Sequence, residues 1–161
     1  MKTKIRKIER IPVQIGQRYY DDFEDIENLL KATNNFSLNE IDIAFELIED
    51  TDYNVKIIDV ENELAGFVIW GQTPATEGTY DMYWLAVHPK FHGQGIAKQI
   101  EEYLVERVKH AGGYLIYVET SSRESYDRTR AFYEKQGYQK LSQVKDYYKR
   151  GEDLVTYGKW I

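Results

Sequence analysis

The stretch from Tyr83 to Val108 limits what this chain can fold into more than any other part of the sequence. It starts with the residue alternation of a half-buried strand and continues into an apolar repeat at helical spacing. The apolar helix face consists of Ile96, Ile100, Tyr103, Leu104 and Val108. The other face carries Lys98, Gln99, Glu101, Glu102 and Glu106, which we expect to be exposed. The stretch therefore predicts a strand, a loop and an amphipathic helix.

The loop between this strand and helix contains Gly93 and Gly95, separated by one residue. Glycines allow a tight turn because they carry no Cβ atom. The first amides of the following helix lack intrahelical partners, and with the helix dipole they favour an anion. We interpret the loop as a candidate diphosphate site, with an ordinary structural turn as the alternative. The sequence has neither a Walker A lysine nor the third glycine of a dinucleotide fingerprint.

Two segments resemble motifs of the GCN5-related N-acetyltransferases (GNAT). The first, His92-Gly93-Gln94-Gly95-Ile96-Ala97, is similar to the family's acetyl-CoA-binding pattern Arg/Gln-x-x-Gly-x-Gly/Ala, with His92 in place of Arg or Gln. The second, from Thr129 to Tyr138, resembles the later family motif, in which a helix carrying a tyrosine ends at Gly-Phe/Tyr. The resemblance covers residues 55 to 161, while the first 50 residues match only loosely.

The order of elements expected along the chain is β-α-α-β-β-β-α-β-α-β-β, which predicts a mixed α/β fold. Strands are expected at 4–11, 54–60, 64–70, 79–87, 114–120, 138–147 and 154–160, and helices at 21–31, after a Ser37 capping box, at 96–109 and at 128–136. The resemblance implies a GNAT-like fold, with a central twisted mixed sheet of about six or seven strands flanked by about four helices.

Length and composition set limits on the class of protein. A chain of 161 residues predicts a single domain, residues 1–161, with a substantial core. The net charge of −6 argues against general nucleic-acid binding; it favours a cationic partner such as an amine, or simply keeps the protein soluble. The absence of cysteine excludes a thiol nucleophile. No signal peptide or membrane-spanning run is visible, so we expect no membrane partner and a cytoplasmic location.

The resemblance also implies where a co-substrate, acetyl-CoA, binds. It would lie between two splayed parallel strands, 79–87 and 114–120, with backbone amides of the first strand polarising the thioester carbonyl. No metal is expected. The implied acetyl-CoA-binding residues are Leu85, Ala86, Val87, His92, Gly93, Gln94, Gly95, Ile96, Ala97, Thr120, Phe132 and Tyr133.

Candidate catalytic residues lie in the second half of the chain. By resemblance, Tyr133 would protonate the departing CoA thiolate, since a phenol stays protonated at neutral pH; its alternative is packing beside Phe132. Glu119 is the preferred base for the amine, and its alternative is a hydrogen bond to a neighbouring strand or loop. Asp81 and Tyr83 are expected on the acceptor side.

These features predict an N-acetyltransferase that transfers an acetyl group directly to a primary amine. The alternatives are a non-catalytic acyl-CoA-binding sensor or interaction module and a nucleotide-binding protein that uses the same loop. The sequence leaves open whether the acceptor is a small molecule or a protein amine, and whether the chain forms a homodimer. Six aromatic residues have two possible roles: they could form a wall for the acceptor, or they could simply pack on the surfaces of the strands. They are Trp70, Tyr80, Tyr83, Trp84, Tyr147 and Tyr148.

Overall fold

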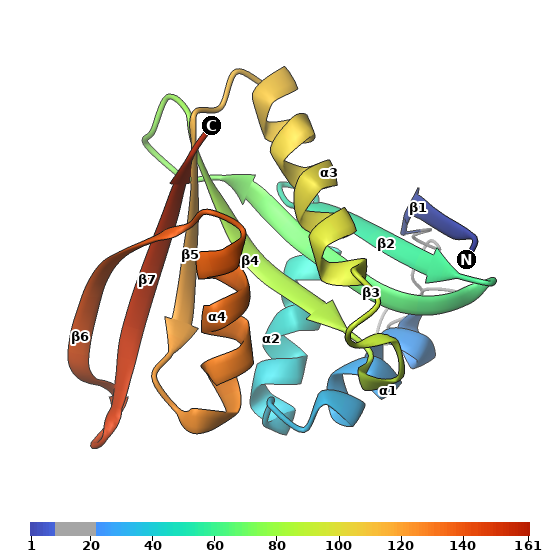
Figure 1. The fold of residues 1–161 in the computed structure, drawn as a ribbon, viewed down its shortest axis with the longest axis horizontal. Helices are drawn as coiled ribbons and strands as arrows, with labels where there is room; N and C mark the ends of the chain where they lie inside the picture. Colours follow the sequence, from blue (N-terminus) through green and yellow to red (C-terminus); the bar gives the residue numbers. More distant parts are fainter. Residues whose placement is uncertain (9–21) are drawn as a thin grey trace. The chain divides into compact units, whose positions relative to one another are not determined.

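The computed structural model describes residues 1–8 and 22–161. These residues form one sheet with the strand order β1-β2-β3-β4-β5-β7-β6 and four α-helices (Figure 1). The strands are β1 (Thr3–Lys7), β2 (Asn54–Val60), β3 (Glu63–Gln72), β4 (Thr79–Val87), β5 (Leu115–Ser121), β6 (Gln139–Lys149) and β7 (Glu152–Trp160). The helices are α1 (Phe23–Thr33), α2 (Leu38–Glu49), α3 (Ile96–His110) and α4 (Asp127–Lys135), with the short 3₁₀ turns η1 (Pro89–Phe91) and η2 (Glu124–Tyr126).

The element order confirms the mixed α/β prediction, and the differences lie at element ends. The first strand was expected to run from residue 4 to 11, but β1 ends at Lys7, and residues 9–21 lie outside the described part of the chain. The expected start of the first helix, Asp21, falls in the same range. The chain divides into two compact units, Met1–Trp70 with Trp84–Glu101 and Gly71–Tyr83 with Glu102–Ile161. Both β4 and α3 contribute residues to each unit.

In the first unit, β1 pairs antiparallel with β2, and β2 pairs antiparallel with β3. A two-residue turn of Glu61 and Asn62 joins β2 to β3, and both residues have positive φ, at 50° and 65°. Such turns match the right-handed twist of the flanking strands. The predicted turn also contained Glu63, which instead begins β3.

The predicted capping box of α2 is confirmed. The Glu40 amide donates to the Ser37 hydroxyl at 3.2 Å, and the Ser37 amide donates to the Glu40 carboxylate at 2.7 Å. This pair satisfies two amides at the start of the helix and sets where α2 begins. The predicted apolar face is buried, and its Phe45 ring stacks on Phe23 of α1 at 4.3 Å.

The end of β4 is held against β3 by a close backbone approach within the first unit. A Cβ atom added at Gly66 would lie 2.8 Å from the carbonyl oxygen of Ala86, so only glycine fits there. The amide of His88 then donates to the carbonyl of Ala65 at 2.8 Å. These contacts set the position of Leu85 to Val87, three of the residues implied in acetyl-CoA binding.

In the second unit, β5 pairs antiparallel with β7, and β7 pairs antiparallel with β6. Helix α4 packs against β7, where the Tyr133 ring lies 6.0 Å from the ring of Tyr157 (Figure 1). Ile116 and Val118, which are buried on β5, alternate with Tyr117 and Glu119. Because side chains alternate along a strand, Tyr117 and Glu119 project from the opposite face of β5.

Helix α4 ends as the sequence predicts. Gly137 has a φ of 89°, which suits the residue just past a helix C-terminus. The amide of Tyr138 donates to the Tyr133 carbonyl at 3.0 Å and satisfies one of the last helical acceptors. This bond also fixes the C-terminal turn that carries Tyr133.

One prediction for α3 is wrong. Glu101 was placed on the exposed face of this helix, but only 1% of its surface is exposed. The neighbouring Ile100, Leu104 and Val105 are also buried, at 2%, 0% and 8%. The buried part of α3 is therefore wider than the single apolar stripe visible in the sequence.

Candidate active site

The glycine loop, His92 to Gly95, precedes α3 in the first unit and is exposed along its whole length. Gly93 and Gly95 have φ values of 74° and 77°, a left-handed conformation that side chains other than glycine adopt at a cost. A Cβ atom added at either glycine would meet no atom within 4 Å. The glycines are thus needed for backbone conformation, and the space beside them is open to a ligand.

Hydrogen bonds to β4 and η1 hold the glycine loop. The His92 Nε2 atom lies 2.9 Å from the Val87 carbonyl, and the Gln94 side-chain amide donates to the Lys90 carbonyl at 3.3 Å. The Lys90 amide donates to His88 Nδ1 at 3.1 Å. His92 therefore ties the loop to the end of β4, which is a structural role for the position where the sequence departs from the family pattern.

The side chain of Ile96 anchors the first turn of α3. It is 1% exposed, while Ala97 beside it is partly exposed. The Gln99 amide donates to the Gly95 carbonyl at 3.1 Å, so the helical hydrogen bonds start directly at the loop. The backbone amides that precede Gln99 in α3 have no helical carbonyl one turn earlier to accept their hydrogen bonds. Together with the open space at the two glycines, this arrangement fits an anionic group such as the diphosphate of acetyl-CoA.

Tyr133 lies in an aromatic cluster of the second unit and is 4% exposed. Its ring lies 5.5 Å from Phe132 and 5.3 Å from Tyr138. Tyr157, the third ring beside it, donates its hydroxyl to the Glu134 carboxylate at 3.1 Å. Burial and then this bond raise the pKa of Tyr157. The packing that was the alternative interpretation of Tyr133 is therefore present, and it holds the phenol in one place.

Thr120, another residue implied in acetyl-CoA binding, is 3% exposed on β5. Its hydroxyl donates to the Val155 carbonyl on β7 at 3.0 Å. Because a hydroxyl has one hydrogen, the Thr120 hydroxyl can only accept a hydrogen bond from any further group.

One face of the second unit, which we name the polar face, carries three predicted residues, Asp81, Tyr83 and Glu119, together with Tyr117. Asp81 of β4 is the register partner of Tyr117 of β5 in a parallel ladder, so their side chains share a face. The Asp81 carboxylate accepts hydrogen bonds from the Tyr83 hydroxyl at 3.2 Å and from the Thr73 hydroxyl at 2.7 Å. The predicted acceptor pair, Asp81 and Tyr83, is thus in direct contact.

Glu119 is exposed on the polar face and lies among phenols. The Tyr117 hydroxyl donates to its Oε1 atom at 3.3 Å. Burial, followed by the charge of Glu119, raises the pKa of Tyr117. The same two causes, in the same order, raise the pKa of Tyr148 on β6 to about 12. Both phenols are therefore protonated at neutral pH and able to donate hydrogen bonds to a carboxylate.

The ladder between β4 and β5 is short. Over the described residues of the second unit it joins Thr79, Tyr80 and Asp81 to Leu115, Ile116 and Tyr117, and its register ends there. Both strands continue, β4 into Tyr83 and β5 to Ser121. The carboxyl end of this ladder therefore lies beside Asp81, at the edge of the polar face.

The six aromatic residues considered for an acceptor wall have different surroundings. In the second unit, Tyr147 and Tyr148 pack edge to face at 5.1 Å, while the ring of Tyr80 lies against Gly113. In the first unit, Trp84 lies 4.9 Å from Phe36, and Trp70 is 4% exposed. Of these six residues, Tyr83 donates a hydrogen bond to Asp81, and Tyr148 is influenced by the charge of Glu119.

Sequence reasoning missed Tyr117, which donates a hydrogen bond to Glu119 and is the register partner of Asp81. The signal was present, because Tyr117 precedes Glu119 by two residues on a predicted strand and so shares its face. Thr73 was also missed. It lies in the loop before β4, and its contact with Asp81 leaves no periodic trace in the sequence.

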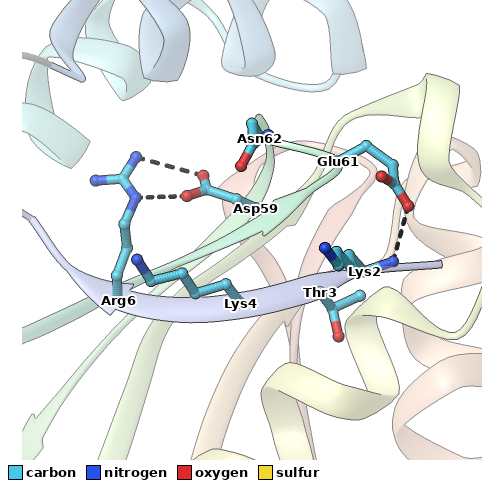
Figure 2. Close-up of a pocket in the computed structure, with 7 residues that line it drawn as sticks. All are labelled: Lys2, Thr3, Lys4, Arg6, Asp59, Glu61 and Asn62. Carbon is cyan, nitrogen blue, oxygen red and sulfur yellow. Dashed lines mark hydrogen bonds and ion pairs between the residues drawn. The ribbon is translucent and has the colours of Figure 1, made fainter.

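A shallow surface pocket of the first unit lies along β1 and the β2–β3 turn (Figure 2). Its lining is Lys2, Thr3, Lys4, Arg6, Asp59, Glu61 and Asn62, and it includes none of the predicted site residues. Within residues 1–8 and 22–161, no three His, Asp or Glu side chains are grouped to hold a metal ion. In the same part of the chain, no helix is long and apolar enough to cross a membrane.

Comparison with known proteins places the chain in a family. The profile of the acetyltransferase (GNAT) domain matches residues 51–140. A crystal structure described as a GNAT-family acetyltransferase from Desulfovibrio desulfuricans is 30% identical, with a TM-score of 0.86 over 99% of both chains. No curated protein matches the chain in sequence. The chain belongs to the GNAT acetyltransferases. It is an acetyl-CoA-dependent acetyltransferase, as the family profile and the 30% identical structure indicate.

Two further solved structures share the fold at lower identity. The ribosomal-protein-S18-alanine N-acetyltransferase of Escherichia coli is 17% identical, with a TM-score of 0.77 over 99% of this chain and 94% of that one. An aminoglycoside 6′-N-acetyltransferase complexed with coenzyme A is 17% identical, with a TM-score of 0.75 over 98% of this chain and 96% of that one. At this identity the likeness concerns the fold alone.

Proposed function

We propose that this acetyltransferase transfers the acetyl group directly to a primary amine of its acceptor. The observation that carries the proposal is the polar face, where Asp81 and Glu119 supply two carboxylates among phenols that stay protonated. Carboxylates attract a cationic amine and can accept the proton that it must lose before attack. The acceptors named for the two distant structures, a protein alanine and an aminoglycoside, are compatible with an amine.

The first unit is assigned to binding of acetyl-CoA. The glycine loop and the first amides of α3 hold the diphosphate, with Gln94 and Ala97 beside it. The backbone amides of Leu85, Ala86 and Val87 hydrogen-bond the pantetheine arm and polarise the thioester carbonyl. The support for these roles is the open space at Gly93 and Gly95 and the fixed position of the β4 end.

The second unit is assigned to proton transfer. Glu119 accepts a proton from the ammonium group, and the free amine then attacks the acetyl carbonyl. A C–N bond forms, the C–S bond breaks, and Tyr133 gives its proton to the departing thiolate. The second proton, which leaves the nitrogen as the amide forms, returns to Tyr133 and restores the phenol. No covalent enzyme intermediate is needed in this sequence of steps. Asp81 and Tyr83 hold the acceptor, and Thr120 and Phe132 line the acetyl-CoA side.

A non-catalytic acyl-CoA sensor is the alternative for the same residues. It would bind acetyl-CoA but release no thiol when amines are added. We further propose that residues 1–161 act as one acyltransferase domain in the cytoplasm. A sedimentation measurement would determine whether two copies of the chain associate.

The test of the assigned base is a thiol-release assay over a panel of primary amines. We expect Glu119→Gln to lower kcat/KM for the amine about 100-fold, because the acceptor of the proton is lost. Its affinity for acetyl-CoA should not change. Glu124→Gln, at an exposed carboxylate in η2, is the matched control and should retain the full rate. Full activity of Glu119→Gln would overturn the role of Glu119, and an absence of amine-dependent thiol release would overturn the amine acceptor.

A further inference from the structure

A chain of hydroxyl groups crosses three strands of the second unit and ends at Glu119. We propose that Tyr117 is a positioning residue for the general base, and that Ser142 and Thr156 support it through hydrogen bonds on the same face of the sheet. This inference rests on the proposed function, because it assumes that Glu119 takes the proton of the amine.

The first link joins β6 to β7. The Ser142 and Thr156 hydroxyl oxygens lie 2.7 Å apart, and these two residues are register partners. Thr156 is 2% exposed, so its hydroxyl is withdrawn from solvent and needs partners within the protein. It is also the register partner of Glu119 on β5, which places the chain of hydroxyls directly beside the carboxylate.

The second link joins β7 to β5. A hydrogen bond from Thr156 to the Tyr117 phenol opposes the effects that raise the pKa of this tyrosine. The Tyr117 hydroxyl in turn donates to Glu119 Oε1 at 3.3 Å. Because a phenol has one hydrogen and Tyr117 uses it on Glu119, Thr156 acts as the donor to Tyr117. The hydrogens then point in one direction, from Ser142 through Thr156 and Tyr117 to Glu119.

This arrangement solves a geometric problem for the base. Glu119 is exposed, and an exposed glutamate side chain has several rotamers of similar energy. A general base must be within hydrogen-bond reach of its proton, so an unrestrained carboxylate would spend part of its time in unproductive positions. The hydrogen bond from the Tyr117 hydroxyl to Glu119 favours one of these rotamers.

Other groups also face this carboxylate. Tyr148 of β6 is influenced by the charge of Glu119, and Asp81 of β4 influences Tyr117 from the opposite side. Asp81 has its own donors in Thr73 and Tyr83. Among the described residues, Tyr117 is the side chain that donates a hydrogen bond to Glu119.

The test is the rate of Tyr117→Phe, measured by thiol release with a saturating amine. We expect kcat to fall about tenfold with KM for acetyl-CoA unchanged, since the base is present but less well placed. In the Glu119→Gln background the same change should cause no further loss, because no base remains to be positioned. Thr156→Val should lower kcat in the same direction by a smaller amount.

The controls separate this inference from the proposed function. Tyr114→Phe, an exposed tyrosine just before β5, should leave kcat unchanged. An unchanged kcat in Tyr117→Phe, or an equal loss in the Glu119→Gln background, would overturn the positioning role, even if Glu119→Gln has lost most of its rate and the proposed base stands. A fully active Glu119→Gln would overturn both. Partial unfolding of the Tyr117→Phe variant would lower the rate in both backgrounds, so it would not imitate the expected result.

Discussion

The rings of Tyr133 on α4 and Tyr157 on β7 lie 6.0 Å apart, yet their hydroxyls have different assigned roles. The Tyr157 hydroxyl donates a hydrogen bond to Glu134 at 3.1 Å. The Tyr133 hydroxyl is instead proposed to donate a proton to the departing CoA thiolate. Replacing each tyrosine by phenylalanine should therefore separate catalysis from stability. We expect Tyr133→Phe to lower kcat about 100-fold with little change in melting temperature, because proton donation is lost and packing is kept.

Tyr157→Phe is the matched variant from the same aromatic cluster. It should lower the free energy of unfolding by about 1 kcal/mol, since Glu134 loses its donor, and should retain turnover. Thiol release and thermal unfolding of the two purified variants check both statements. If Tyr157→Phe lost turnover and Tyr133→Phe did not, the assignment of the general acid would have to move to Tyr157.

The glycine loop offers a second prediction, about acetyl-CoA affinity. Gly95→Ala forces a side chain into a left-handed conformation, at a cost of about 1–2 kcal/mol. If the backbone relaxes to avoid this strain, its amides leave the position needed for the diphosphate. We expect calorimetric titration to show acetyl-CoA affinity reduced at least tenfold, about 1.4 kcal/mol.

Gly112→Ala is the control for left-handed backbone strain at a glycine outside the glycine loop. Gly112 has a φ of 82° and the same open surroundings, but it lies just after α3. The variant should lose similar stability and keep the wild-type affinity for acetyl-CoA. Equal loss of affinity in both variants would mean that the effect comes from general destabilisation.

The third prediction concerns an ion-pair network that joins β1, β2 and the start of α1. Arg6 contacts Asp22 and Asp59 at 2.6 Å each; Figure 2 shows the contact with Asp59. Hydrogen bonds to Asp22, followed by those to Asp59, raise the pKa of Arg6 further above its usual range. We expect Arg6→Ala to lower the free energy of unfolding by about 2–4 kcal/mol, because a buried Asp22 loses its cation.

Lys4→Ala, two residues earlier on the same strand, is its control. Lys4 is exposed, so the change should stay within about 0.5 kcal/mol. Urea unfolding of both variants makes the comparison. A loss below 1 kcal/mol for Arg6→Ala would show that the network contributes little beyond exposed ion pairs.

The fourth prediction is a pH dependence of stability. The Ser121 hydroxyl donates to Glu152 at 2.6 Å, and this bond, with the charge of Arg123 adding to it, holds the pKa of Glu152 below its ordinary value of 4.5. A carboxyl whose pKa is lowered in the folded state stabilises the protein above its unfolded-state pKa. That stabilisation is lost as the pH falls through the lower folded-state pKa. The relevant window is therefore below pH 4.5.

Glu152→Gln isolates this contribution. We expect the variant to be about 1–2 kcal/mol less stable than the wild type at neutral pH, with the difference shrinking as the pH is lowered below 4.5. Urea unfolding at several pH values measures the gap. A difference that stays constant down to the acid range would show that Glu152 acts through packing and not through its charge.

Local signals explain why much of the fold was predictable. The bounds of β4, the Ser37 capping box and the Gly137 helix end each depend on residues within one turn or strand. Their physical causes, alternation, capping and positive φ, are all present in neighbouring residues. The glycine loop could be recognised for the same reason.

Features that depend on distant partners were not predictable. The burial of Glu101 cannot be inferred from one helix, because it depends on what packs against α3. The chain from Ser142 to Glu119 depends on the register of three strands, and a shift of one residue would reverse every face. The Arg6 network joins residues that lie far apart in the sequence.

The most direct test of the account follows the acetyl group itself. Wild-type protein is incubated with acetyl-CoA and an amine panel, and mass spectrometry then examines both the amine and the protein. The account predicts that at least one primary amine gains an acetyl group in step with thiol release, and that the protein carries none. Acetyl-CoA binding without any acetylated amine, or an acetyl group held covalently on the protein, would contradict direct transfer.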